Sequence, residues 1–193
     1  MPRRTMRLLS WSDRASFRAP GVLVGHFSEL GDLHPKLAPD ELARAHDAKF
    51  VARRMFQRQL AGASNLEWSP VGQPILTEGG FVSFAACEDW TVAARSDEFP
   101  VGIDIELPSR ATATLSDLSQ DRDFFGPDEE DSLRAWTLKE ACAKALGIGI
   151  GQGTAWCDTS RIADGRLHTQ KGDFRVESHP FESGWISVAE WIG

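Results

Sequence analysis

The sequence predicts a mixed α+β fold. Segments with helical periodicity alternate along the chain with segments of strand-like alternation, and the strands gather in a central hairpin and a C-terminal meander. With 193 residues, of which 41% are hydrophobic and 25% charged, the chain has the length and composition of a globular protein with a core of its own. Strands and helices in this order are typical of the α+β class.

The first predicted helical region covers residues 39–63 and follows a predicted strand. It opens with proline and acidic residues, carries apolar residues among charges and ends at Gly62, a pattern that indicates one helix or two. Residues 69–76 contain two prolines and a glycine, so they predict a loop. Residues 81–95 predict a β-hairpin with its turn around Glu88.

A further strand is predicted over residues 99–107, where apolar side chains alternate with Gly102, Asp104 and Glu106. The polar residues 108–123 predict a surface loop or a short helix.

Residues 126–147 predict the second long helix, because Pro127 and acidic residues stand at its start and Gly147 at its end. The tail from Arg166 predicts a β-meander, with turns at residues 171–173 and 182–184.

Composition excludes several classes of function. The net charge of −7 disfavours nucleic-acid binding, which needs a positive field to neutralise phosphates. Cys87, Cys142 and Cys157 form no CxxC pair, so neither a disulfide framework nor a zinc site is indicated, and we expect small core residues. No apolar run is long enough to span a membrane, and no signal-peptide pattern follows the basic start. We therefore expect a cytoplasmic, monomeric protein.

Two acidic residues of the predicted strand are candidate metal ligands. Asp104 and Glu106 point the same way, roughly 6–7 Å apart, because side chains alternate between the faces of a strand. Magnesium prefers oxygen ligands and commonly binds one or two carboxylates together with substrate phosphates. The alternative is a strand with one solvated polar face.

The predicted second helix offers a third carboxylate. Glu140 and Lys144 are four residues apart and share a face with Trp136, apart from an apolar stripe that includes Leu138 and Cys142. Considered alone, they could form an exposed ion pair worth about 0.3–0.5 kcal/mol. Considered with Asp104 and Glu106, Glu140 could complete a magnesium site, while Lys139 or Lys144 supplies positive charge for a phosphate.

Two motifs resemble a known family. "VGIDIE" at residues 101–106, followed about thirty positions later by "WTLKEACAK" at residues 136–144, is similar to the paired signature of the Sfp-type 4'-phosphopantetheinyl transferases. The resemblance implies a pseudo-dimeric fold of two similar halves with coenzyme A between them. We place these halves at residues 1–100 and 101–193, the second carrying both motifs.

The resemblance also implies roles for individual residues. Asp104, Glu106 and Glu140 would bind Mg²⁺, and Asp104, Glu140 and Lys144 would form the catalytic set. The residues expected to contact coenzyme A are Arg54, Arg58, Gln73, Ser83, Phe84, Lys139 and Lys144. Such an enzyme moves 4'-phosphopantetheine from coenzyme A to a serine of an acyl or peptidyl carrier protein and releases 3',5'-adenosine bisphosphate. Glu140 could take the serine proton, directly or through a water on the ion.

The chain departs from the family pattern at two positions that normally serve coenzyme A phosphates. Phe84 replaces a histidine after Ser83, and Gln73 replaces a lysine. Losing two charge-assisted hydrogen bonds, each worth roughly 1.5–3 kcal/mol, would weaken coenzyme A binding about a hundredfold or more. Three alternatives remain: a transferase with altered coenzyme A recognition, an enzyme for another substrate such as a carrier-bound intermediate, and a non-catalytic carrier-binding protein.

Overall fold

The fold is the mixed α+β fold that the sequence predicts. The computed structural model describes residues 6–17, 19–29, 37, 41–61, 66–69, 73–108, 129–149, 153 and 155–193. Three predicted features fall almost wholly outside these residues: the loop or short helix over 108–123, the start of the second helix at Pro127 and the end of the first at Gly62.

The first sheet is formed by strands from the first half of the chain. Its order is β1-β2-β6-β5, with β1 parallel to β2 and the other pairs antiparallel. The strands are β1 (Arg7–Ser10), β2 (Gly21–His26), β5 (Phe81–Cys87) and β6 (Trp90–Ser96). The predicted hairpin is therefore confirmed as β5–β6, and Glu88 adopts a positive φ of 52° in its turn.

The second sheet is antiparallel throughout and has the order β7-β10-β9-β8. Its strands are β7 (Val101–Glu106), β8 (Arg166–Thr169), β9 (Gly172–Phe181) and β10 (Gly184–Trp191). The predicted meander and the strand over 99–107 are confirmed. The edge strand β7 pairs with β10, about eighty positions away in the chain, so its partner could not be inferred from neighbouring sequence.

Two long helices are described, α1 (Ala48–Ala61) and α3 (Glu129–Ala145). The short 3₁₀ helices are η1 (Trp11–Ser16), η2 (Phe27–Glu29), η3 (Leu42–Arg44) and η6 (Thr159–Arg161). Hence the predicted helical region 39–63 comprises one 3₁₀ turn and one α-helix in its described part. No described helix combines the length and apolarity that crossing a membrane requires.

The prediction of a plain loop over residues 69–76 is wrong. Residues Pro74–Leu76 form β4, which pairs antiparallel with β3 (Leu66–Trp68). Three-residue strands leave too short a pattern to detect, and Pro74 is tolerated because it begins an edge strand.

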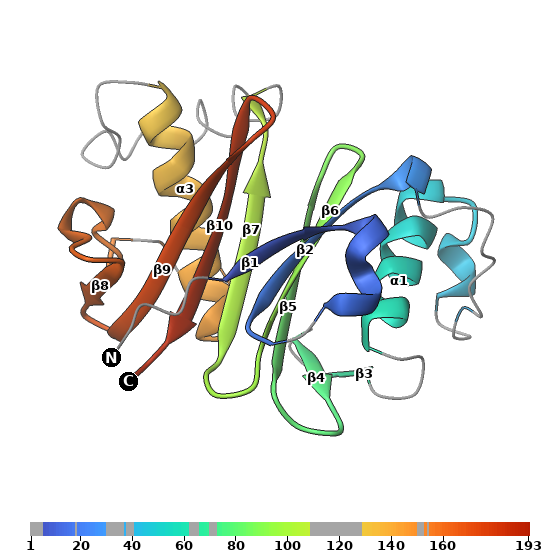
Figure 1. Ribbon diagram of the computed structural model, residues 1–193, viewed down its shortest axis with the longest axis horizontal. Coiled ribbons are helices and arrows are strands. Elements are labelled where there is room, and N and C mark those ends of the chain that lie inside the picture. The colour runs from blue at the N-terminus through green and yellow to red at the C-terminus, as the bar shows by residue number, and fades with distance from the viewer. Residues whose placement is uncertain are drawn as a thin grey trace.

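The two sheets pack together in the middle of the molecule, and each carries a long helix on its outer side (Figure 1). A central core between the sheets includes Val22 and Val92 of the first and Ile103, Ile105 and Val188 of the second. A second core lies between α3 and the second sheet, and a third lies between α1 and the first sheet. Structural equivalence of the two halves, and their division at residue 100, remain predictions.

Candidate metal centre

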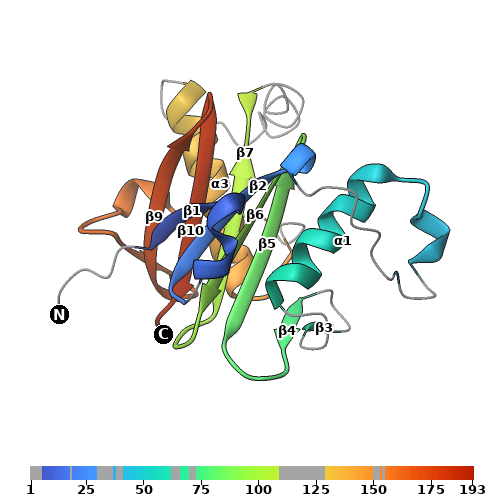
Figure 2. The ribbon, with the colours of Figure 1, turned by 45° about the vertical axis from the view of Figure 1, so that its right-hand side comes forward.

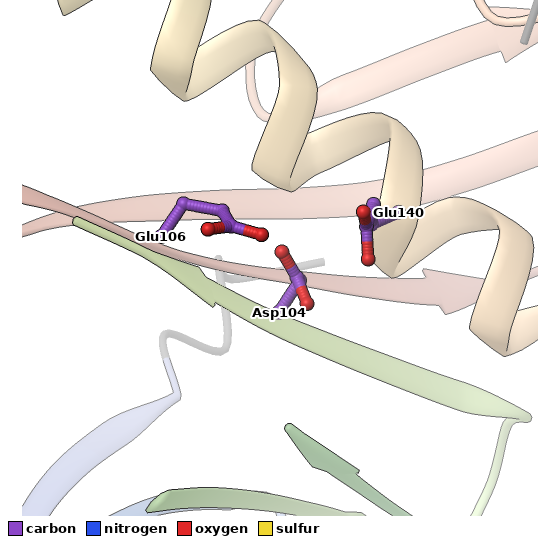
Figure 3. Close-up of side chains that lie close together, drawn as sticks. All are labelled: Asp104, Glu106 and Glu140. Carbon is purple, nitrogen blue, oxygen red and sulfur yellow. The ribbon is translucent and has the colours of Figure 1, made fainter. Parts of the chain in front are cut away.

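Three carboxylates converge where α3 crosses β7. Asp104 and Glu106 extend from β7 and Glu140 extends from α3 toward them (Figure 3). One oxygen from each residue lies within 4.8 Å of the other two. The strand and helix faces singled out in the sequence therefore meet, although ion binding by these residues stays a prediction.

Close packing of α3 on β7 brings these side chains together. A Cβ atom at Gly102 would lie inside the backbone of α3 at Ala141 and Ala145, so only glycine permits this approach. Gly102 lies on the same face of the strand as Asp104 and Glu106, two residues before the first and four before the second. The glycine thus sets how near the helix carboxylate comes to the strand carboxylates.

Burial rules out both solvent-exposed alternatives. Asp104 and Glu106 are only 4% and 8% exposed, so this is not a solvated strand face. Glu140 and Lys144 are also partly buried, with 15% and 31% of their side chains exposed, so they are not an ordinary surface pair.

Lys144 ties the helix to the strand. Its Nζ donates to Asp104 Oδ1 at 2.6 Å and to the Ile103 carbonyl oxygen at 3.1 Å, and lies 3.9 Å from Glu140 Oε2. Lys144 therefore places one positive charge beside two of the three carboxylates, Asp104 and Glu140.

Burial and mutual repulsion raise the pKa values of two of these carboxylates. Burial, and next the negative charge of Asp104, raise the pKa of Glu140 to about 8. Burial also raises the pKa of Asp104, and the attraction of Lys144 offsets this only in part. Without a further cation, Glu140 therefore holds a proton through much of the neutral range.

The donor set suits a hard divalent cation. Asp104 Oδ2 is buried and accepts no hydrogen bond from the described residues. An orphaned buried oxygen is costly, and a cation would satisfy it while removing the repulsion that raises the pKa of Glu140. Three carboxylate oxygens without a nearby histidine or thiolate ligand in the cluster favour magnesium over zinc. The Cys87 thiol donates to Glu106 Oε2 at 3.7 Å.

An open groove of about 330 Å³ begins beside this cluster. Lys144, from the last turn of α3, and Gln73, the residue before β4, both line it. Gln73 also covers the end of α3, where its side chain fills the space a Cβ of Gly147 would need. The other walls are mainly apolar: Pro74, Ile75, Gly80, Phe81, Val82, Pro100, Val101, Ala145, Leu146 and Trp191.

Ser83 and Phe84, adjacent on β5, face opposite sides of the first sheet. The Ser83 hydroxyl is buried and accepts a hydrogen bond from the Ile103 amide at 3.1 Å, which joins the edges of the two sheets. Phe84 packs with Ala52 and Phe56 in the core beneath α1. Both side chains thus have structural roles, and their contact with coenzyme A stays a prediction.

Arg54 and Arg58 make no described contact with the carboxylate cluster. Instead, both pair with Glu41: Arg54 Nε lies 2.9 Å from Oε1, and Arg58 Nη2 lies 2.5 Å from Oε2. Lys139 is 2% exposed and does not line the groove, so its proposed contact with a phosphate also stays a prediction.

Sequence reasoning missed Glu41, which looks like one more acidic residue before a helix. It also missed the ring of Trp68, whose centroid lies 4.5 Å from the Arg54 guanidinium carbon. Local pattern could not reveal either contact, because Trp68 lies in a three-residue strand and Glu41 in a turn.

Comparison with known proteins gives a family match. No curated protein shows a significant match to the chain. The family model described as the 4'-phosphopantetheinyl transferase superfamily matches residues 100–190, the segment that contains β7, α3 and all three carboxylates. Over this C-terminal segment the chain is similar to the 4'-phosphopantetheinyl transferase superfamily.

Proposed function

We propose that the protein is a magnesium-dependent transferase that moves 4'-phosphopantetheine from coenzyme A to a serine of an acyl or peptidyl carrier protein. The observation that carries this proposal is the convergence of Asp104, Glu106 and Glu140, with Lys144 between them and an open groove. The superfamily match over residues 100–190 supports the same reaction class.

Each charged group has a task in this reaction. Asp104, Glu106 and Glu140 would hold the ion, which when bound neutralises pyrophosphate charge and stabilises the departing bisphosphate. Lys144 reaches both Asp104 and the groove, so its ammonium group can bind a phosphate oxygen of a donor lying there. The buried surroundings strengthen both interactions, because fewer water molecules screen them.

The transfer requires one bond to form and one to break. The serine oxygen attacks the phosphorus next to pantetheine, the bond from that phosphorus to the bridging oxygen breaks, and 3',5'-adenosine bisphosphate leaves. Glu140 would accept the serine proton as a carboxylate, because a bound cation would counter the burial and the Asp104 charge that raise its pKa.

The decisive experiment incubates the protein with coenzyme A, Mg²⁺ and a panel of apo carrier proteins, and then weighs the carriers by mass spectrometry. A mass gain equal to one phosphopantetheine group, abolished by EDTA, is expected for at least one carrier. Absence of this gain with every carrier would contradict the proposed transfer.

A second candidate is a carrier-binding homologue without transferase activity. The apolar packing of Phe84 and the uncharged Gln73 favour it, because both positions lack the groups that would contact phosphate. Carrier binding measured by calorimetry separates the two candidates: a binding protein retains it in the Glu140→Gln variant and shows no mass gain in either form.

A further inference from the structure

The buried thiol of Cys87 contacts the carboxylate cluster from the first sheet. Cys87 ends strand β5 and is completely buried. Its Sγ donates to Glu106 Oε2 at 3.7 Å. Glu106 is also buried, so few water molecules compete for this oxygen. Although a thiol is a weak donor, its acceptor here belongs to a carboxylate, which strengthens the hydrogen bond.

Contacts around Cys87 fix its place relative to the second sheet. Its backbone pairs with Trp90 across the β5–β6 hairpin, and the ring of Trp90 packs edge-on against Phe181 of β9, with 4.8 Å between the centroids. Four residues earlier on β5, the Ser83 hydroxyl accepts from the Ile103 amide of β7. Strand β5 thus runs beside β7 (Figure 2), and it presents the thiol from a closely packed core position.

A glutamate that binds a metal has to be ordered first. Its side chain has three rotatable bonds, and fixing them on metal binding costs conformational entropy. A hydrogen bond that already holds the carboxylate removes part of this cost. The carboxylate has room for both partners, because its two oxygens offer about four acceptor positions. Carboxylates that bind metals are themselves commonly held by hydrogen bonds from neighbouring groups.

A separate observation indicates that a cation belongs beside Glu106. The Glu106 carboxylate extends toward Asp104 (Figure 3), and one oxygen of each belongs to the cluster that also includes Glu140. Asp104 is only 4% exposed, and its Oδ2 has no hydrogen-bond partner among the described residues. The thiol therefore holds one carboxylate of a site in which a neighbouring carboxylate oxygen lacks a partner that a cation would supply.

We propose that Cys87 is a positioning residue of the metal centre, whose thiol holds the Glu106 carboxylate in the orientation that binds Mg²⁺. The inference rests on the proposed function, which supplies the metal. It also makes the centre depend on the first sheet, although the three carboxylates lie on β7 and α3. Cys87 precedes residues 100–190, the segment that the family model matches.

Replacing Cys87 by serine and by alanine tests the inference, because these two side chains differ only in a hydroxyl group. Calorimetric titration with Mg²⁺ alone measures binding without coenzyme A or carrier. Cys87→Ala should bind Mg²⁺ about threefold to tenfold more weakly than the native protein, which is the worth of one hydrogen bond. Cys87→Ser restores a donor, so it should bind Mg²⁺ about threefold or more tightly than Cys87→Ala.

Cys87→Val covers the case in which the alanine variant does not fold. Valine fills the space of the thiol without offering a donor, so this variant should weaken Mg²⁺ binding as Cys87→Ala does. Circular dichroism checks that each variant is folded. An affinity of Cys87→Val equal to that of the native protein would count against the thiol as the group that holds Glu106.

Cys157→Ala is the matched control. Cys157 is also completely buried, but it lies in the core between α3 and the second sheet. Each alanine variant removes one buried sulfur, so urea denaturation in EDTA should show a loss of stability for both. Only Cys87→Ala should lose Mg²⁺ affinity, whereas Cys157→Ala should stay within about twofold of the native protein. If Cys87 serves only to fill the core, both variants will bind Mg²⁺ like the native protein, and the inference is overturned.

The carrier assay separates this inference from the proposed function. Mg²⁺ binding that depends on Cys87, without a mass gain of any carrier, contradicts the proposed transfer and supports the role of Cys87. A carrier mass gain together with an Mg²⁺ affinity that Cys87→Ala does not change supports the transfer and refutes the inference. No Mg²⁺ binding by the native protein refutes both.

Discussion

Glu140 is the residue on which the proposed chemistry most depends. It lies beside Asp104 and Glu106 in a largely buried site, with its Oε2 3.9 Å from the Lys144 ammonium group. Ionising Glu140 there is unfavourable, as its pKa of about 8 expresses. A bound divalent ion would make ionisation of Glu140 favourable instead. Glu140 therefore destabilises the metal-free protein at high pH, but it would stabilise the metal-bound protein.

Replacing Glu140 by glutamine should therefore have opposite effects with and without metal. At pH 8 in EDTA, the melting temperature should rise by about 2–4 °C, which corresponds to roughly 1 kcal/mol for a chain of this size. The stabilisation by Mg²⁺ and the carrier mass gain should both be lost. Scanning calorimetry measures the first two effects. Glu182→Gln, in the exposed turn between β9 and β10, should behave like the native protein.

The stability of the metal-free protein should fall as the pH rises from about 5 to 8. Glu140 has a raised pKa in the folded state, so its contribution is fully present below the unfolded value of 4.5 and is lost as the pH approaches about 8. The raised pKa of Asp104 acts in the same direction. The contribution of Glu140 is on the order of a few kcal/mol.

Magnesium should counter this loss, because it binds the deprotonated carboxylates. The shift in melting temperature on adding Mg²⁺ should thus be larger at pH 8 than at pH 6. Thermal denaturation across this range, with EDTA or Mg²⁺, measures both slopes. A metal-free stability that rises with pH would contradict the assignment of charges in the cluster.

Among the elements, the approach of α3 to β7 determines the geometry of the site. Gly102 lets the backbone of α3 come close at Ala141 and Ala145, and the Ser83 hydroxyl holds the other side of β7 through Ile103. The strand is therefore held from both sides, which limits how far its carboxylates can move relative to Glu140.

Gly102→Ala should push α3 away from β7. The new methyl group would meet helix backbone rather than a flexible side chain, so we expect a loss of about 3 kcal/mol or more in the free energy of unfolding. Stabilisation by Mg²⁺ should weaken as well. Urea denaturation with and without Mg²⁺ tests this. At Gly149 a Cβ meets no atom within 4 Å, so Gly149→Ala should have little effect.

Elements with a long, regular pattern could be predicted from sequence, and short ones could not. The hairpin β5–β6, the strand β7 and the C-terminal meander each show alternation over several residues, and α3 shows both helical spacing and a glycine stop. The three-residue strands β3 and β4 are too short for such a pattern. The parallel pairing of β1 with β2 depends on contacts that local sequence does not encode.

At the scale of the whole molecule, one shared apolar core and hydrogen bonds between the sheets hold the two sheets together. Val22 and Val92 of the first sheet pack against Ile103 and Val188 of the second. Glu190, buried on β10, accepts a hydrogen bond from Ser96 of β6 at 2.7 Å while it pairs with Arg175. Neither sheet has a complete core without the other.

Residues 101–193 expressed alone should consequently fail to fold into a stable unit. Ile103, Ile105 and Val188 would be exposed on one sheet face, and an exposed apolar face of this kind promotes aggregation. Size-exclusion chromatography and circular dichroism of the fragment, compared with the full chain, test this. A monomeric, cooperatively melting fragment would show that the central core is not needed.

Local spacing was sufficient to predict which polar side chains share a face. Backbone geometry places Asp104 with Glu106 on a strand, and Glu140 with Lys144 on a helix, whatever the rest of the chain does. The meeting of those two faces, the pairing of Arg54 with Glu41 and the burial of the Ser83 hydroxyl against Ile103 became visible only in the folded chain. Each of these joins residues of different elements, and such contacts follow from how sheets and helices pack rather than from the period of any one segment.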